Sequence, residues 1–335
     1  MIASVAFRNF KALRSAQLTL APLNVIIGPN GSGKSSLIQA LLRLRTLARL
    51  PLKAPSSAAP ANQAGPEVTF RFAAPHEKLV AVMSCVHDGQ CDALEVSPLG
   101  AAEDAADWAG VRTALLGIRA YLFDHYAMAL PAPRHDDQVL GSNGGNVAAV
   151  LARWRETAPE AFAGVRETVL RLLPEFDELE LITRDGGTVE VALRLADEGV
   201  LVHAENLSQG SLYIIALAAL AHDPAPPPLL CIEEVDRGVH PRLLREVRDL
   251  LYRLSYPAAQ GVNRQPVQVI VTTHSPYLLD QFRDHPEEIV IAEKHGRAAT
   301  LQRLSDRPDV LQAIGDGALG DLWYAGVLGG VPDER

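Results

Sequence analysis

The sequence predicts an α/β fold with an antiparallel β meander and a helical insertion, and three observations support this. An apolar, β-branched run at residues 23–27 is followed by a glycine-rich loop and then by an apolar helical pattern. Strand and helix patterns alternate again between residues 208 and 282, as in a sheet covered by helices. Between these segments, short alternating runs separated by turns predict antiparallel strands.

The order of these patterns predicts three regions. They are an N-terminal lobe at 1–102, a helical insertion at 103–178 and a C-terminal lobe at 179–335. We expect strands at 2–20 (two strands), 68–72, 79–87, 93–97, 179–183, 189–195, 200–203, 229–232 and 267–272. We expect helices from 35 to about 50, at 208–221, 242–254 and 276–282, and through much of 104–173, with a surface loop at 51–66.

Composition limits the class of protein. The chain has 335 residues, 48% of them hydrophobic, and a net charge of −9, so it supports a sizeable core but no general attraction to nucleic acid. A local basic groove remains compatible with this charge. No signal peptide or membrane-spanning run is visible, and the three cysteines show no metal-type spacing. These features predict a cytoplasmic protein without a membrane partner and without a disulfide framework.

The glycine-rich loop fits a phosphate-binding loop. Residues 28–35 read Gly-Pro-Asn-Gly-Ser-Gly-Lys-Ser between the expected strand and helix. Backbone N–H groups would surround phosphate oxygens, Lys34 would reach the β- and γ-phosphates, and the Ser35 hydroxyl would bind Mg²⁺. The residues expected to bind nucleotide here are Asn30, Gly31, Ser32, Gly33, Lys34, Ser35 and Ser36. The alternative is a glycine-rich turn that happens to precede Lys-Ser.

Two carboxylates follow the apolar strand expected at 229–232. We expect Glu233 to hold Mg²⁺, directly or through water, and Glu234 to act as general base on the attacking water. The alternative is a buried strand with a solvated acidic end.

Three further segments are candidates for contact with nucleotide. Ser208 and Gly210 stand at a helix start, where a hydroxyl and free amides form an anion site or a plain helix cap. His274 follows a strand and would contact the γ-phosphate or the water, or else cap the helix that begins near Pro276. Asp236 lies in a turn that Gly238 sharpens and that would reach a facing subunit, or serve only as a loop.

Together these motifs resemble the ATP-binding-cassette (ABC) ATPase heads of the SMC and RecF-like group. The resemblance is closest to stand-alone AAA-family ATPases related to the ATPase half of OLD-family nucleases. It is carried by residues 7–11, 28–35, 207–212, 232–241 and 272–276, and less specifically by 141–147 and 319–324. It implies a P-loop NTPase of ABC-ATPase head type that uses ATP and Mg²⁺.

The resemblance also implies roles for the later motifs. Residues 208–211 would be the signature motif, Asp236 would belong to the D-loop, and His274 would be the switch histidine. Two heads would then form a homodimer around two ATP molecules, each signature motif completing the other subunit's site. Gln209, Ser211 and Glu233 depart from the commoner residues of the family at their positions. A Q-loop glutamine is not assignable, with Gln90 and Gln138 as weak candidates, and no nuclease domain is expected in the short tail.

Three functions follow as alternatives. The first is an ATPase that dimerises on ATP and acts on DNA or on an effector or nuclease subunit, in DNA repair or phage defence. The second is a nucleotide-gated scaffold or sensor subunit with little turnover, and the third, less favoured, is a transporter ATPase subunit. The insertion would contact the partner through arginines, for which the candidates are Arg112, Arg119, Arg134, Arg153, Arg155 and Arg166.

Overall fold

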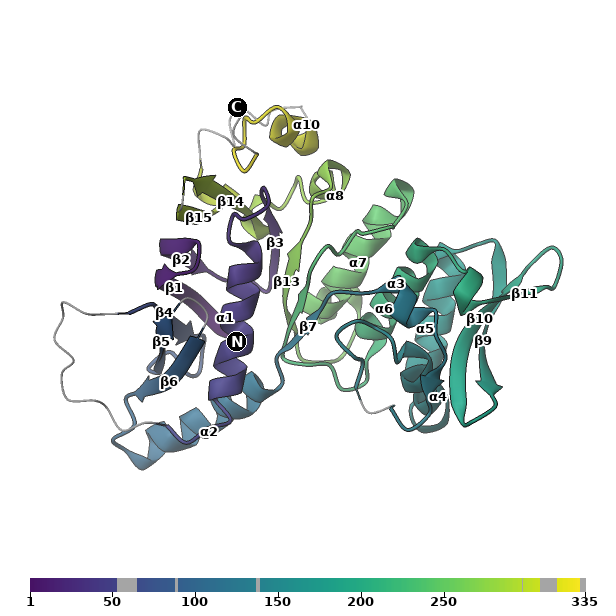
Figure 1. Ribbon diagram of the computed structural model, residues 1–335, viewed down its shortest axis with the longest axis horizontal. Helices are drawn as coiled ribbons and strands as arrows, with labels where there is room; N and C mark the ends of the chain where they lie inside the picture. Colours follow the sequence, from purple (N-terminus) through teal and green to yellow (C-terminus); the bar gives the residue numbers. More distant parts are fainter. Residues whose placement is uncertain (53–64, 88–89, 137–138, 297, 308–317, 332–335) are drawn as a thin grey trace. The chain divides into compact units, whose positions relative to one another are not determined.

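A computed structural model describes residues 1–52, 65–87, 90–136, 139–296, 298–307 and 318–331, which form two compact units (Figure 1). Unit 1 comprises 1–120, 227–231 and 266–335, and unit 2 comprises 121–226 and 232–265. The chain therefore passes between the units four times, which local sequence patterns do not reveal. The segment predicted as an insertion, 103–178, is mostly helical and has parts in each unit.

A six-stranded sheet in unit 1 carries the glycine-rich loop. Its strand order is β15-β14-β3-β13-β12-β7. The strands are β3 (Leu23–Ile27), β7 (Arg119–Tyr121), β12 (Leu229–Ile232), β13 (Gln268–Thr272), β14 (Ile289–His295) and β15 (Ala298–Arg303). β3 lies parallel to β13 on one side and to β14 on the other. Every residue of β3, β12 and β13 is buried, as expected for strands covered on two faces.

A five-stranded antiparallel sheet completes the strands of unit 1. Its order is β2-β1-β4-β5-β6. The strands are β1 (Ile2–Phe10), β2 (Leu13–Thr19), β4 (Glu67–Phe72), β5 (Val80–His87) and β6 (Gln90–Ser97). The predicted N-terminal strand pair and meander are confirmed, and β1 joins them by pairing with β2 and β4.

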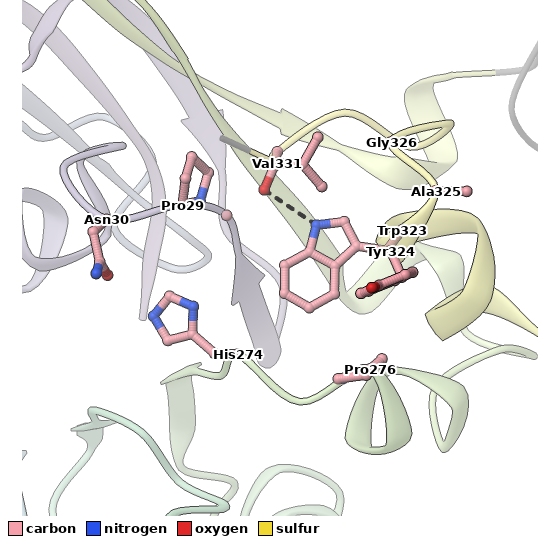
Figure 2. A pocket seen from close by; sticks show the side chains of 11 residues that line it. Pro29, Asn30, His274, Pro276, Trp323, Tyr324, Ala325, Gly326 and Val331 are labelled. Carbon is pink, nitrogen blue, oxygen red and sulfur yellow. Dashed lines mark hydrogen bonds between the residues drawn. The ribbon is translucent and has the colours of Figure 1, made fainter. Parts of the chain in front are cut away.

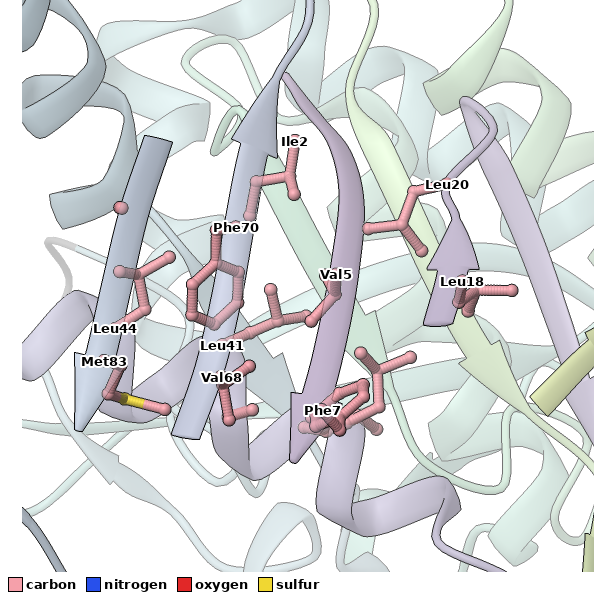
Figure 3. Close-up of a cluster of buried hydrophobic side chains, with 14 of the residues drawn as sticks. Ile2, Val5, Phe7, Leu18, Leu20, Leu41, Leu44, Val68, Phe70 and Met83 are labelled. Carbon is pink, nitrogen blue, oxygen red and sulfur yellow. The ribbon is translucent and has the colours of Figure 1, made fainter. Parts of the chain in front are cut away.

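The helices of unit 1 are α1 (Lys34–Leu47), α2 (Ala102–Leu116), α8 (Pro276–Asp280) and α10 (Leu319–Tyr324). Leu37, Leu41 and Leu44 recur on one face of α1 and are fully buried. They belong to one apolar cluster with Phe70 and Val5 of the antiparallel sheet (Figure 3). Burial of each such side chain contributes about 1.5–3 kcal/mol, so the helix that follows the loop is firmly anchored.

The cysteines correct one expectation. Cys85 and Cys91, at the end of the β5–β6 hairpin, form a disulfide, whereas Cys231 in β12 is free and buried. The expectation of a chain without disulfide bonds is therefore wrong for this hairpin. The spacing of six residues gave no signal, because only the pairing of β5 with β6 brings the two cysteines together.

Unit 2 contains a smaller antiparallel sheet and five α-helices among its described residues. Strands β8 (Ala132–Pro133), β9 (Phe176–Arg184) and β11 (Leu201–His203) each pair with β10 (Thr188–Leu195). The helices are α3 (His125–Met128), α4 (Val147–Thr157), α5 (Pro159–Leu172), α6 (Gln209–His222) and α7 (Leu244–Ser255). The predicted β9–β10 hairpin is confirmed. α6 is buried along most of its length, so its start is held on a rigid element.

No helix in the described part of the chain is long and apolar enough to cross a membrane.

Candidate functional site

The glycine-rich loop connects β3 to α1, as predicted. Its first residue, Gly28, lies so close to β14 that a Cβ there would come within 2.1 Å of the backbone oxygen of Ala292. Only glycine therefore fits at this position. At the other end, Gly33 precedes the helix with a positive φ of 91° and provides no side-chain cap. The first N–H groups of α1 consequently have no side-chain acceptor from their own cap residue.

Two side chains inside the loop indicate a site for an anion. The Lys34 ammonium group donates to the backbone oxygens of Gly28 at 2.7 Å and Pro29 at 2.9 Å, which places a positive charge across the loop. Ser32 is fully buried, and its hydroxyl has no hydrogen-bond partner among the described residues. A buried polar group without a partner is costly, so a ligand that reaches it is favoured. Phosphate oxygens fit this combination of cation, hydroxyl and backbone amides.

The remaining loop residues are open to a ligand. Asn30, Gly31 and Ser35 are exposed, and Ser36 is half-buried. The loop residues expected to bind nucleotide are therefore either accessible or, like Lys34 and Ser32, point into the loop itself.

His274 lies beside this loop. β13 runs parallel to β3, with Thr272 opposite Ile26, and the Thr273 N–H donates to the backbone oxygen of Ile26 at 3.2 Å. The segments that follow the two strands therefore meet at the same edge of the sheet. His274 is exposed and lines a cavity of about 920 Å³ together with Pro29 and Asn30 (Figure 2).

The alternative role of His274 as a helix cap is wrong. Ser275 is the cap of α8, because its hydroxyl accepts from the Leu278 N–H at 3.2 Å. His274 is thus left facing the cavity rather than the helix.

The predicted signature motif lies in unit 2. Ser208 is exposed and caps α6, accepting from the Ser211 N–H at 3.0 Å, so the capping interpretation is correct as far as it goes. Gly210 packs on the turn that contains Asp236, since a Cβ at Gly210 would lie 2.5 Å from the backbone oxygen of Gly238. The Gln209 side chain covers Gly238, and its buried amide nitrogen has no hydrogen-bond partner in the described residues. The predicted signature and D-loop segments thus pack against each other.

The acidic pair follows β12 and also lies in unit 2. Glu233 is half-buried, and its N–H donates to the backbone oxygen of Tyr121 at 2.8 Å. Glu234 is exposed and has a positive φ of 50°, which is rare for a residue with a Cβ and costs on the order of 1 kcal/mol or more. Its carboxylate lies 3.6 Å from the guanidinium of Arg237. Backbone strain at this residue is typical of a functional position.

The structure thus assembles the predicted residues in two groups. The phosphate loop and His274 come together in unit 1, and Ser208, Gly210, Glu233, Glu234 and Asp236 lie in unit 2. Among the described residues, no cluster of three or more His, Cys, Asp or Glu side chains forms a metal cage. The Ser35 hydroxyl and the Glu233 carboxylate are nevertheless hard oxygen donors of the kind that Mg²⁺ binds alongside phosphates and water.

Sequence reasoning missed three residues near the loop. Lys294, at the end of β14, places its ammonium nitrogen 3.4 Å from where a Cβ of Gly31 would lie. Trp323 and Tyr324 line the cavity opposite Pro29 and His274 (Figure 2). The aromatic pair gave a sequence signal only through the family resemblance of residues 319–324, and Lys294 gave none because β14 was not recognised.

The candidate partner-binding arginines are mostly engaged within the chain. Arg112 and Arg119 donate to backbone oxygens of Ala48 and Ile118, and Arg134 and Arg166 pair with Glu156 and Glu178. Of the Q-loop candidates, Gln90 begins β6 and Gln138 lies outside the described residues.

Comparison with known proteins identifies the family. The protein-family model described as "AAA domain, putative AbiEii toxin, Type IV TA system" matches residues 107–280, more than half of the chain. The chain belongs to this AAA-domain family. A second model, "AAA ATPase domain", matches residues 1–70, which include the phosphate loop. No curated protein matches the chain. The family supports nucleotide binding, and the protein is an ATPase.

Solved structures show the same fold. One is an SmcHead bound to the C-terminal winged-helix domain of ScpA, with a TM-score of 0.63 and 18% identity over 91% of this chain and 99% of that chain. Another is the SMC head domain from Thermotoga maritima, with a TM-score of 0.51 and 16% identity over 90% of this chain and 98% of that chain. The predicted α/β fold of ABC-ATPase head type is confirmed.

Proposed function

We propose that two copies of this ATPase close around two ATP molecules, and that closure and hydrolysis control a partner protein or nucleic acid. The observation that carries this proposal is the packed surface of the signature and D-loop segments, where Gln209 and Gly210 lie against Gly238 and leave Ser208 exposed. This surface presents a hydroxyl and a helix start, which suit the γ-phosphate of a nucleotide held by another subunit.

The expected site residues would divide the work of phosphoryl transfer to water. Lys34 would neutralise charge on the phosphates, and His274 would contact the γ-phosphate or the water from the neighbouring strand end. Glu234 would accept a proton from the attacking water. Ser35 and Glu233 would hold Mg²⁺, which when bound neutralises charge on the phosphate oxygens.

Dimer closure would follow from the ATP contacts themselves. In a symmetric dimer, each of two ATP molecules would join one subunit's phosphate loop to the other's signature segment. Linkage then requires that ATP stabilise the dimer and that the dimer bind ATP more tightly than the monomer does. ADP, which lacks the γ-phosphate, should stabilise the dimer less.

Sedimentation tests this proposal. Glu234→Gln should bind ATP without rapid hydrolysis, so ATP should convert it from monomer to dimer. Adding Ser208→Arg, which places a bulky cation at the signature surface, should prevent the conversion and leave ATP binding intact. Ser15→Arg, at an exposed position of β2, is the matched control and should still dimerise. A monomer–dimer equilibrium that is indifferent to ATP would contradict the ATP-bridged dimer.

Phage defence is the pathway that we favour over DNA repair. The matched family's description, "AAA domain, putative AbiEii toxin, Type IV TA system", names a toxin system and no repair protein. In a bacterial host, expression of the chain with its effector should reduce phage plating, and Lys34→Ala should abolish that protection. Unchanged plating together with altered survival after DNA damage would favour repair instead.

A nucleotide-gated scaffold with little turnover is a second candidate, and one observation favours it. The Glu234 carboxylate faces Arg237 at 3.6 Å, which holds the candidate base in an ion pair. Steady-state hydrolysis measured with and without DNA or effector separates the candidates. Stimulated turnover supports the ATPase motor, and nucleotide-dependent assembly at unchanged slow turnover supports the scaffold.

A further inference from the structure

The C-terminal tail segment, residues 318–331, contacts the chain close to His274. The Gly320 N–H donates to the Asp280 carboxylate at 2.7 Å, which fixes α10 on α8. A Cβ at Gly320 would lie 2.5 Å from the backbone oxygen of Pro276, two residues beyond His274. The backbone of α10 therefore lies directly on the segment that presents His274 to the cavity.

The other end of the tail segment contacts the entrance of the phosphate loop. A Cβ at Gly330 would lie 3.5 Å from the Cα of Gly28 and 3.0 Å from the Ile291 side chain. The preceding Gly329 lies against the Glu293 carboxylate. The tail backbone therefore lies beside the first glycine of the loop, and a side chain at Gly330 would crowd the Ile291 side chain of β14.

Trp323 connects these two ends. Its ring is buried, at 8% exposed, and its indole N–H donates to the backbone oxygen of Gly330 at 3.2 Å (Figure 2). Arg307 holds the same stretch by donating to the backbone oxygen of Leu328 at 2.7 Å. The indole also lines the cavity that Pro29 and His274 line. One side chain therefore both bonds to the tail backbone and forms part of the cavity wall.

We propose that the tail segment is a clamp that fixes the phosphate loop relative to the His274 segment, with Trp323 as its positioning residue. The clamp sets the place of Gly28 through Gly330 and the place of Pro276 through Gly320. Phosphoryl transfer depends mainly on positioning, so a small shift between loop and histidine lowers the rate. This inference rests on the proposed nucleotide site and adds a residue outside its known motifs.

The first test compares two glycine substitutions in the full-length protein. Gly330→Ala adds a methyl group, at a φ of 67°, that would lie 3.0 Å from the Ile291 side chain and 3.5 Å from the Cα of Gly28, so the tail backbone should shift beside the loop. Gly296→Ala adds a methyl group at a φ of 60° with no atom within 4 Å. The two share the backbone penalty and differ in the contact. We expect kcat/KM for ATP to fall about tenfold in Gly330→Ala and to stay near wild type in Gly296→Ala. Equal kcat/KM in the two variants would overturn the clamp.

The second test removes the indole donor together with part of the ring, and it guards against misfolding of the first variant. Trp323→Phe keeps an aromatic ring in the same place, so the thermal midpoint should change little while kcat/KM falls about fivefold. If Trp323 acts through the histidine segment, Trp323→Phe combined with His274→Ala should be less than additive. Additive effects, or a loss of stability at unchanged kcat/KM, would assign the tail a purely structural role.

Lys34→Ala separates failure of the clamp from failure of the site. If Lys34→Ala loses ATP binding and Gly330→Ala keeps wild-type kinetics, the site stands and the clamp is wrong. If Lys34→Ala hydrolyses ATP like wild type, the nucleotide site itself is wrong and the clamp with it.

Discussion

Two helix starts in this molecule both contain glycine and serine but differ in their local chemistry. At the start of α1, the Gly33 cap gives no side-chain acceptor, and the buried Ser32 hydroxyl has no partner among the described residues. At the start of α6, the Ser208 hydroxyl accepts from the Ser211 N–H and contacts the Ser211 hydroxyl at 2.8 Å. The first start has no side-chain cap of its own, whereas the second is capped by its own Ser208, although the buried Gln209 amide nitrogen there has no partner among the described residues.

This difference shows which of the two proposed phosphate contacts can be argued from one subunit alone and which requires a second subunit. The phosphate loop indicates an anion from its own geometry, since glycine, lysine and an unpartnered hydroxyl converge there. The signature segment serves as a cap whether or not it meets a nucleotide. Its proposed contact with nucleotide therefore depends on a facing subunit, and substitutions that preserve the cap are the ones that test this proposal.

Removing the charge at the phosphate loop should have the largest effect. In Lys34→Ala, the phosphates lose a charge-assisted contact, so ATP hydrolysis should fall to background and ATP binding should weaken by about 100-fold or more. Hydrolysis and nucleotide binding measure this directly. Lys78→Ala removes an exposed lysine elsewhere in unit 1 and should behave as wild type. Wild-type turnover in Lys34→Ala would show that α1 begins with an ordinary turn.

Removing the proposed general base should have the second-largest effect. Glu234→Gln should slow hydrolysis by about 10²- to 10⁴-fold while ATP binding persists, because the amide cannot accept the proton from water. Single-turnover hydrolysis and equilibrium binding separate these effects. Glu233→Gln should instead raise the Mg²⁺ concentration needed for activity. If Glu233→Gln traps bound ATP and Glu234→Gln remains active, the two roles are exchanged.

Substitutions of Ser208 that differ in charge can separate its role as the cap of α6 from its proposed contact with nucleotide. Ser208→Asp keeps a good cap but places a negative charge at the signature surface, whereas Ser208→Ala removes the cap at a cost of about 1 kcal/mol. If the segment meets a γ-phosphate, Ser208→Asp should lose most hydrolysis at unchanged stability, measured by ATPase assay and thermal unfolding. If the segment is only a cap, Ser208→Asp should be active and Ser208→Ala less stable.

The parts that local sequence could predict are those fixed by neighbouring residues. The strand, loop and helix around Gly28 and Lys34 form a continuous stretch of sequence. The spacing of the glycines and the lysine within it is enough to predict a phosphate-binding loop. The β9–β10 hairpin was likewise visible from its Asp-Gly-Gly turn. These elements need no knowledge of distant partners.

The parts that sequence could not predict depend on distant contacts. The sequence predicts no strand at 289–295, because only the parallel pairing of β14 with β3 shows that these residues belong to the sheet. The Cys85–Cys91 bond needs the β5–β6 pairing, and the place of Trp323 needs its contact with Gly330 and the cavity. Local periodicity contains none of these contacts. The division into units has the same cause, since each unit gathers segments from several parts of the chain.

The smallest expected effect concerns pH and the far end of α6. Burial, and then the charges of Arg253, Arg264 and Arg171, lower the pKa of His222 from 6.5 to about 4. The neutral ring lies 2.9 Å from the Thr168 hydroxyl. Below about pH 6.5 the unfolded chain therefore binds a proton that the folded chain does not, so stability is complete above that pH and falls as pH drops towards 4.

His222→Gln should remove this dependence while keeping a hydrogen-bonding side chain at the end of α6. The thermal midpoint of wild type should fall by a few degrees more than that of the variant between about pH 7.5 and about pH 5. His285→Gln, at an exposed histidine of unit 1 that pairs with Glu287, is the control and should follow wild type. Identical pH profiles for wild type and His222→Gln would mean that His222 is protonated as readily in the folded chain as in the unfolded one. Because this titration lies at the end of α6 opposite Ser208, it should leave ATP-dependent dimerisation at neutral pH unchanged, which separates the stability of unit 2 from its proposed contact with nucleotide.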